Sequence, residues 1–437
     1  MSLLSSDPAA LVQTADVVEV PVSRKARFVS GAVLVVVGLL CALGFGLGSH
    51  AGFDASFGLS PTGAKITVPH LVVPARIVGI VLGLIVVGSG VWRIARGYTR
   101  RMMRWVVAIT IVAVVFSFLC WACTGTKGTS LDLLGLLQQT IFLAVPLILG
   151  ALAGVLCERS GVINVAIEGQ MLTGAFAGAL FGSVTHSAGV GVVAAIIAGG
   201  LIGALLALFA IRYLVNQVVL GVVINLLALG LTGYIYDALM ASDQNTYNTP
   251  PGLHPIAIPG LSDVPIIGPL LFNQNLIVYA MYVLIIAIDL ALFRSRWGLR
   301  TRAVGEHPKA ADTVGINVRR TRYVNVIVGG LVAGLGGASL TIGSALPFGK
   351  NMTNGKGFIA LAAVIFGRWS PRGALGAALL FGFADALQNV LSFIGTPVSI
   401  PSQILAMLPY LATILAVAGL VGRVRAPAAD GEPYVGR

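Results

Sequence analysis

A polar stretch interrupts the apolar runs of this chain at residues 158–171, with the sequence ERSGVINVAIEGQM. It holds two carboxylates, on Glu158 and Glu168, and two amides, on Asn164 and Gln170. Ionisable groups beside apolar runs are unfavourable in lipid and usually face a cavity or a partner. One interpretation is therefore that these side chains line or gate a pathway for a polar solute.

The same residues also have a purely structural interpretation. Glu158 and Arg159 would form an ion pair at one edge of the membrane, and Glu168 would cap a broken helix. Two more amides, on Asn225 and Asn389, lie within later apolar runs. An amide can bind hydroxyls or base edges without a charge, but it can equally hold two helices together. Both interpretations stay open from the sequence.

A basic loop at residues 301–322, TRAVGEHPKAADTVGINVRRTR, is the second region with a possible function. Pro308 is well placed to begin a helix and Gly315 to end one, so a short helix is expected over residues 308–314. A short amphipathic helix surrounded by cations is suited to docking on another protein. The alternative interpretation is an anchor for lipid head groups.

Several kinds of chemistry find no support in the sequence. It contains no G-x-x-x-x-G-K-[ST] loop, no H-E-x-x-H and no G-x-S-x-G, and its five histidines are scattered. Cys120 and Cys123 form a C-x-x-C, but this lies inside an apolar run, where an exposed, activated thiolate is not expected. We therefore expect no enzyme activity, no ATP site of this type, no metal and no cofactor.

Composition indicates that lipid is the solvent of the elements that position these groups. Hydrophobic residues make up 57% of the 437 residues and charged residues only 10%, whereas a soluble protein has about 25% charged residues. The mean hydropathy is +0.93. The cations behind the net charge of +12 lie in short loops, which favours membrane orientation over nucleic-acid binding. The expected fold class is an all-α polytopic membrane protein.

Apolar runs that could cross a bilayer, which takes about 20 residues, recur along the chain. Eleven of them lie near residues 29–48, 71–91, 105–123, 133–155, 162–182, 189–211, 218–240, 274–293, 323–343, 373–393 and 403–422. A shorter run at residues 357–367 is counted as a twelfth span, because without it Arg423 would lie outside. With twelve spans most of the 28 cations lie inside, and both termini are expected in the cytoplasm.

Two sets of spans follow the same order. The four runs between residues 133 and 240 recur between residues 323 and 422, and the run at 274–293 separates the sets. Because four spans and one more make an odd number, the second set is inverted in the membrane, an arrangement that places a pathway between two halves of a transporter. Residues 241–273 contain no Lys or Arg and are expected to form an irregular outer loop, either a connector or part of a docking face.

Three separated segments resemble one family. They are residues 158–178, residues 298–320, and residues 354–388 with the sequence GKGFIALAAVIFGR near their start. They are similar to the permease subunits of bacterial ATP-binding-cassette (ABC) importers of the ribose and branched-chain amino-acid type. The forms IEGQM and GKGFIALAAVIFGR look most like those of the nucleoside and simple-sugar permeases. The resemblance covers residues 131–423.

The resemblance implies a type II ABC importer permease fold with inverted four-helix repeats and about 12 transmembrane helices. It implies a pathway for uptake of nucleosides or related simple sugars across the bacterial inner membrane. The implied partners are a cytoplasmic ABC ATPase, a second and non-identical permease, an extracellular substrate-binding lipoprotein and the lipid bilayer. The basic loop would dock on the ATPase through Glu306, His307, Pro308, Ala311, Asp312 and Gly315. The candidate pathway residues are Asn164, Glu168, Gln170, Asn225 and Asn389.

The domains expected from the sequence are a cytoplasmic tail at residues 1–28, an accessory two-helix extension at 29–104, a permease domain at 105–423 and a cytoplasmic tail at 424–437. The alternative function is a self-sufficient secondary transporter or channel for small polar solutes. Such a protein needs its own coupling-ion site, for which Asp289 and Asp385 are the candidate carboxylates.

Overall fold

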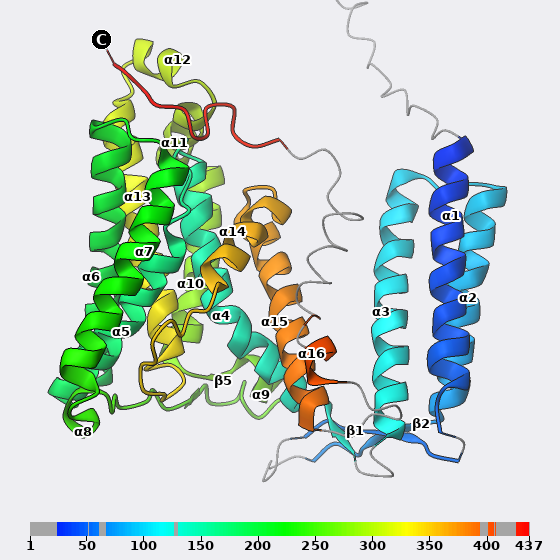
Figure 1. Cartoon of the computed structure of the whole chain (residues 1–437). Coiled ribbons are helices and arrows are strands. Elements are labelled where there is room, and N and C mark those ends of the chain that lie inside the picture. Colours follow the sequence, from blue (N-terminus) through cyan, green and yellow to red (C-terminus); the bar gives the residue numbers. More distant parts are fainter. Residues whose placement is uncertain are drawn as a thin grey trace, which may run out of the picture. The chain divides into compact units, whose positions relative to one another are not determined.

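The computed structural model describes residues 24–50, 52–60, 67–125, 130–393, 401–405, 407 and 425–436. These residues divide into two compact units, each of which is described separately (Figure 1). The N-terminal unit holds the described residues of Met1–Ser56 and Leu71–Leu131. The second unit holds those of Phe57–His70, Asp132–Ile394 and Ile400–Arg437.

The N-terminal unit consists of three helices joined by short strands. Its helices are α1 (Arg24–Leu39), continued by the π-helix η2 (Leu40–Leu47), α2 (Ala75–Ala95) and α3 (Arg100–Thr124). The strands β1 (Ala55–Gly58), β2 (Leu71–Val73) and β3 (Leu131–Asp132) form a small sheet with β1 in the middle. Glycines let α1 and α2 approach closely, since a Cβ on Gly38 would lie 2.6 Å from the backbone nitrogen of Val87.

The structure corrects the expected boundary of this extension. The helix α3 packs with α1 and η2, where the rings of Phe45 and Phe118 lie 5.4 Å apart and Trp121 Nε1 donates to the carbonyl of Gly48 at 3.1 Å. The unit therefore has three helices and extends to Leu131, instead of two helices that end at residue 104. Its first helix begins at Arg24, inside the tail expected at residues 1–28.

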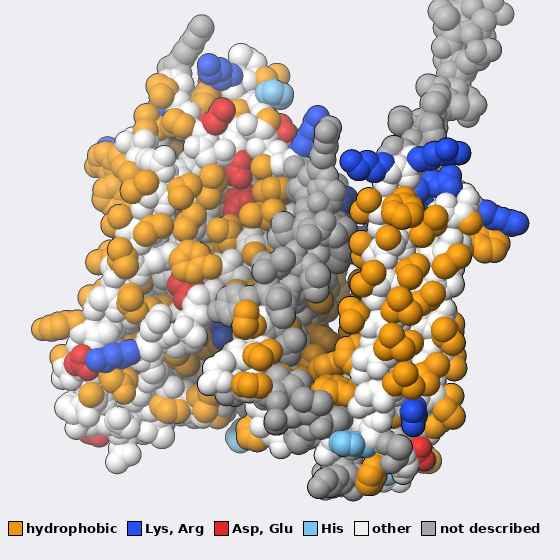
Figure 2. Space-filling view, turned by 45° about the vertical axis from the view of Figure 1, so that its right-hand side comes forward, with side chains coloured by type: hydrophobic (Ala, Val, Ile, Leu, Met, Phe, Trp, Pro, Cys, Tyr) orange, Lys and Arg blue, Asp and Glu red, His pale blue; other side chains and the backbone are white. Residues whose placement is uncertain are grey.

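The surface of the N-terminal unit has the pattern of a membrane-spanning bundle. Figure 2 shows hydrophobic side chains along its helices and most of its visible Lys and Arg side chains at one end. Val33, Leu84 and Val112 are examples of large apolar side chains that are more than half exposed. An exposed apolar band next to a basic end is stable when the band faces lipid.

The second unit contains the remaining helices. Its long elements are α4 (Leu133–Glu158), α5 (Ile167–Thr185), α6 (Ala188–Ala207) with η3 (Leu208–Arg212), α7 (Gln217–Ile235) with η4 (Tyr236–Met240), α10 (Leu276–Arg294), α13 (Val318–Leu340), α14 (Lys356–Phe366) and α15 (Pro371–Phe393). Its short helices are α8 (Gln244–Tyr247), α9 (Ile267–Leu271), α11 (Arg296–Glu306), α12 (Pro308–Thr313) and α16 (Ser402–Leu405). The strands β4 (Ile256–Ala257) and β5 (Asn273–Gln274) pair antiparallel.

Nine helices within the described ranges are long and apolar enough to cross a membrane. They are the helices that contain α1, α2, α3, α4, α6, α7, α10, α13 and α15. Two further expected spans form helices that do not meet this criterion, namely α5, whose first turn contains Glu168, and α14, which has 11 residues. Eleven residues rise only about 16 Å, about half of the hydrocarbon thickness. The expected span at 403–422 lies outside the described residues except for 403–405 and 407.

The helix α4 forms the centre of the second unit. It is apolar on all sides, and 89% of its most apolar window is buried, as expected for a helix surrounded by other helices. The helices α13, α14 and α15 pack against it. Gly154 brings α14 close, since a Cβ there would lie 2.7 Å from Val364 Cγ2.

The first helices of the two repeats, α4 and α13, run in opposite directions, as an inverted repeat requires. Near the start of α4, Gln138 Nε2 donates to the carbonyl of Pro269 at 3.0 Å. Just after the end of α13, the carbonyl of Ile342 accepts from the N–H of Leu253 at 3.1 Å. The start of one helix and the end of its counterpart therefore contact the same connecting segment, which has the irregular structure expected from its prolines and glycines.

Candidate functional site

The carboxylate of Glu168 joins the helices α5 and α14 at their N-termini. Its Oε1 accepts from the N–H of Gly355 at 2.8 Å, and its Oε2 accepts from the N–H of Gly357 at 2.6 Å. The N–H groups of a first helical turn have no partner within the helix, and they carry a partial positive charge that favours an anion. Glu168 is buried. Through these two bonds its carboxylate caps α14, a helix of the other repeat.

Glycine is required on the α14 side of this contact. Gly355 adopts φ +84°, in the left-handed region, and it is the residue immediately before α14. A Cβ on Gly357 would lie 2.5 Å from Glu168 Cα, so a side chain there would push the two helices apart. The sequence NGKG thus fits this site because the backbone of α14 touches the backbone of α5.

Asn225 on α7 holds the irregular segment that leads into α5. Its Oδ1 accepts from the N–H of Gly169 at 2.8 Å, and its Nδ2 donates to the carbonyl of Val165 at 2.9 Å. The amide thus satisfies a first-turn N–H of α5, which has no partner within the helix, and a carbonyl of the non-helical segment before it.

Asn164 and Gln170 form a second, fully buried pair behind Glu168. Asn164 Nδ2 donates to Gln170 Oε1 at 3.0 Å and contacts the sulfur of Cys157 at 3.4 Å. Neither side chain is exposed. Asn164 Oδ1 and Gln170 Nε2 have no protein partner among the described residues, so this pair retains one acceptor and one donor for an internal water. We call the four side chains of Asn164, Glu168, Gln170 and Asn225, with Gly355 and Gly357, the α5–α14 junction.

Asn389, the fifth candidate pathway residue, is not part of this junction. It lies on α15, is partly exposed, and shares none of the hydrogen bonds that the described residues of the junction form. The structure therefore brings four of the five candidates together and leaves one separate. Of these four, Glu168 and Asn225 bond backbone groups of neighbouring elements, whereas Asn164 and Gln170 bond each other.

The expected ion pair between Glu158 and Arg159 does not form in the described part of the chain. Instead, Trp369 Nε1 donates to Glu158 Oε2, and Arg159 Nε donates to the carbonyl of Trp369 at 2.7 Å. Both charged side chains thus bind the turn between α14 and α15, where Arg368 and Trp369 have φ values of +54° and +51°. This region of φ is strained for residues other than glycine, so the contacts from α4 help to hold the turn.

The two carboxylates proposed for a coupling-ion site lie in different surroundings. Asp289 Oδ2 accepts from Arg372 Nη2 at 2.7 Å and from Arg372 Nε at 3.0 Å, so a protein cation already balances its charge. Asp385 is partly exposed on α15 and has no hydrogen bond to Asp289 among the described residues. The structure does not bring the two carboxylates into one described site.

The basic loop contains the expected short helix. The helix α12 begins at Pro308, which is its first residue, and Gly315, at φ +83°, follows its end. Ala311 is buried in a small cluster with Val304, Val318 and Tyr434. The other expected docking residues, Glu306, His307 and Asp312, are exposed.

The C-terminal segment, residues 425–436, packs against this loop (Figure 1). Its Ala429 N–H donates to the carbonyl of Gly305 at 2.9 Å, and its Ala428 N–H donates to Glu306 Oε2 at 3.2 Å. Arg322 Nη1 donates to the carbonyl of Glu432 at 2.8 Å. We call α11, α12 and this segment the docking face. No pattern in the sequence indicates that the segment belongs to it, because contacts between residues so far apart along the chain leave no local signal.

A cavity of about 690 Å³ lies between α12 and the C-terminal segment. Asp430 is a partly buried carboxyl of the C-terminal segment, and burial raises its pKa to about 7, although the nearby Arg322 opposes the shift. The docking face therefore joins a loop from the middle of the second unit to the C-terminal segment.

The long apolar helices within the described ranges are those of a polytopic membrane protein. The profile of the family described as branched-chain amino acid transport system, permease component, matches residues 136–419. The chain belongs to this family. The match begins inside α4, so the three helices of the N-terminal unit lie outside it.

Curated relatives cover nearly the same part of the chain. The guanosine ABC transporter permease protein NupQ of Bacillus subtilis is 45% identical over 312 residues, which are 69% of this chain and 96% of that protein. The nucleoside ABC transporter permease protein NupC of Lactococcus lactis is 36% identical over 309 residues, 69% of this chain and 96% of that protein. The putative glucose ABC transporter permease protein TsgC13 of Haloferax volcanii is 36% identical over 58% of this chain and 77% of that protein. No solved structure matches.

The same two bacteria each have a second, more distant relative. These are the permease proteins NupP of Bacillus subtilis, 25% identical, and NupB of Lactococcus lactis, 24% identical. The chain is thus a multi-pass membrane protein of an ABC permease family in which similar but non-identical permeases occur in pairs within one organism.

Proposed function

We propose that this chain is the permease subunit of an ATP-driven importer of nucleosides in a bacterial inner membrane. The observation that carries the proposal is the 45% identity to a guanosine permease over 96% of its length. The polar side chains of the α5–α14 junction support it, because they are three amides and one capped carboxylate. Neutral polar solutes such as nucleosides can pass such groups without a large electrostatic barrier.

The docking face is the proposed site of a separate ABC ATPase. Its short helix, α12, is anchored by the buried Ala311 and presents exposed groups, among them Asp312. The basic residues at this end, such as Arg319 and Arg320, support a cytoplasmic location by the positive-inside rule. The opposite end, with the irregular segment at residues 241–273, then faces outward and receives a substrate-binding lipoprotein.

A second, non-identical permease would complete the pathway. The paired relatives in two bacteria support this partner. Asn389, partly exposed on α15, is the proposed lining residue, whereas the α5–α14 junction transmits movement between the two repeats of this chain. When the ATPase moves the docking face, the two halves shift together because Glu168 links α5 to the backbone of α14.

The test is uptake of labelled guanosine by cells that produce the complete importer. We expect uptake to need the ATPase and to be inhibited by unlabelled nucleosides but not by glucose. Asp312→Ala should reduce uptake severalfold, whereas Asp54→Ala, which removes an exposed carboxylate from the N-terminal unit, should not. Uptake that persists without the ATPase would support a secondary transporter instead.

Simple sugars are the second candidate substrates, and the 36% identity to a putative glucose permease favours them. In this case glucose would inhibit uptake and nucleosides would not. The ligand that the cognate lipoprotein binds, identified by mass spectrometry after purification, gives an independent answer.

A further inference from the structure

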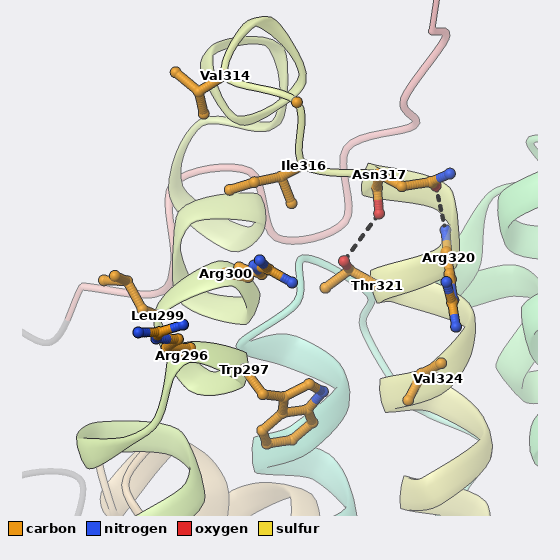
Figure 3. A pocket seen from close by; sticks show the side chains of 11 residues that line it. Arg296, Trp297, Leu299, Arg300, Val314, Ile316, Asn317, Arg320, Thr321 and Val324 are labelled. Atoms are coloured by element: carbon orange, nitrogen blue, oxygen red, sulfur yellow. Dashed lines mark hydrogen bonds between the residues drawn. The ribbon is translucent and has the colours of Figure 1, made fainter.

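Three arginines line a cavity of about 850 Å³ between α11 and the start of α13. Figure 3 shows Arg300 pointing from α11 toward α13, with Arg320 on the opposite wall and Trp297 at the base. Arg296, one turn before Arg300, is the third. None of the described lining residues is acidic, and the three guanidinium groups have no ion pair within the described residues. We call this cavity the arginine pocket.

The walls of the arginine pocket change from basic to apolar along α13. Arg320 lies in the first turn of this helix and Val324 one turn further into the span, and both line the pocket. Val324 is 41% exposed. From Val318 to Val324 the helix rises about 9 Å, which is enough to cross the head-group layer and reach the acyl chains.

The helix α11 has the composition of a helix that lies in the membrane interface. Arg296, Leu299 and Arg300 are spaced so that they share one face, and Leu299 is 62% exposed. Trp297 next to them is a residue type enriched at head-group level. Cations beside exposed apolar side chains on one short helix fit the boundary between head groups and acyl chains.

We infer that the arginine pocket binds the phosphate of an anionic phospholipid, with the acyl chains along Leu299 and Val324. Guanidinium groups bind phosphate oxygens in pairs, and basic pockets between membrane helices on the cytoplasmic side bind anionic head groups. A lipid is favoured over an acidic surface of the ATPase, because a soluble protein does not reach Val324 below the membrane surface. The cytoplasmic location of the pocket rests on the proposed function.

This lipid would occupy a site between α11 of the docking face and the start of α13. The arginine pocket is lined by Gly315 and Ile316, which directly follow α12, and by Asn317, which caps α13. Thr321 Oγ1 donates to the carbonyl of Asn317 at 2.9 Å, a bond that stabilises the first turn of α13 (Figure 3). A bound phosphate would therefore fix the connection through which α12 moves α13.

The test is lipid titration of the delipidated importer, purified with the full chain and its partners, by native mass spectrometry. Phosphatidylglycerol and phosphatidylcholine with identical acyl chains are the probes. We expect phosphatidylglycerol to bind at least tenfold more tightly. The variant Arg300→Gln with Arg320→Gln should lower its affinity by about tenfold to thirtyfold, and Arg101→Gln with Arg104→Gln, which removes two exposed arginines of α3, should not.

Two further measurements keep the inference testable. Soluble glycerol phosphate at millimolar concentration should not displace the lipid; displacement would assign the pocket to a soluble phosphate and overturn the inference. If the arginine variant does not fold, Val324→Trp, which fills the apolar part, should weaken binding of both lipids. Equal affinity for the two lipids, or release of the ATPase with unchanged lipid binding, would also overturn it. Lipid titration needs no nucleoside, so a failure of the uptake assay does not decide it.

Discussion

The α5–α14 junction and the docking face both use a glutamate to bind backbone N–H groups, but in different surroundings. Glu168 is buried and accepts two N–H groups at 2.8 and 2.6 Å. Glu306 is exposed and accepts one, at 3.2 Å. In the junction water cannot replace a lost partner, whereas at the docking face it can. The difference indicates that the junction holds the fold together and that the docking face is free to exchange partners.

Removing each of the two carboxylates in turn should give the largest change in stability that tests this difference. Glu168→Ala leaves two N–H groups of α14 unpaired in a dry environment, and we expect it to lower the free energy of unfolding by about 3 kcal/mol. Glu306→Ala is the matched control, and it should lower the free energy of unfolding by less than about 1 kcal/mol. Thermal unfolding of both full-length variants in the same detergent measures the effect. Equal shifts of Tm would contradict the assignment of the junction as a structural brace.

The next largest effect is expected from a comparison of two asparagines, Asn225 within α7 and Asn216 at its N-cap. Asn225→Leu removes both hydrogen bonds that the amide makes at the start of α5. We expect it to lower the free energy of unfolding by about 2 kcal/mol. Asn216 caps the start of the same helix through two longer bonds of 3.1 Å at an exposed position. Asn216→Leu should therefore lower the free energy of unfolding by only about 1 kcal/mol, because water replaces part of the cap. If both variants unfold at the same temperature, burial does not decide the contribution of these amides.

The sequence predicted the membrane fold and most of the span positions because both depend on composition and run length. It also predicted α12, since Pro308 and Gly315 are local signals. It predicted α3 as a span but assigned it to the permease domain, because α3 is as apolar as the spans that follow it and only its packing assigns it to the N-terminal unit.

The partners of the polar residues could not be predicted in the same way. Glu168 was expected to cap a helix or gate a pathway, but its bonds are to Gly355 and Gly357, nearly 190 residues further along the chain. Glu158 and Arg159 are adjacent and opposite in charge, yet both bind the turn at Trp369. Pairs of this kind are set by tertiary packing, and one sequence contains no signal for them.

Two glycines of α7 extend the comparison to backbone packing. A Cβ on Gly221 would lie 2.6 Å from Val165 Cβ, whereas one on Gly230 would meet nothing within 4 Å. We expect Gly221→Ala to destabilise the chain by about 1 to 2 kcal/mol through overpacking. Gly230→Ala should stabilise it by up to about 1 kcal/mol, since alanine favours the helix. Shifts of Tm with the same sign would contradict a close approach of α7 to the junction.

The smallest expected effect is confined to the C-terminal segment and depends on pH. Burial raises the pKa of Asp430 from 3.8 to about 7, and the nearby Arg322 opposes the shift. The docked segment therefore binds a proton more tightly than the free segment does. Docking is strongest below about pH 4, weakens as the pH rises toward about 7, and is constant above that value.

Hydrogen exchange of residues 425–436 at pH 5 and pH 8, corrected for intrinsic exchange rates, measures this effect. We expect severalfold faster corrected exchange at pH 8 in the wild-type chain. Asp430→Asn keeps the shape of the side chain but does not titrate, so its corrected exchange should be the same at both values of pH. If the Asn variant keeps the pH dependence of the wild type, another group controls the segment. In that case the hydrogen bonds to Gly305, Glu306 and Arg322 would hold the segment without a contribution from Asp430.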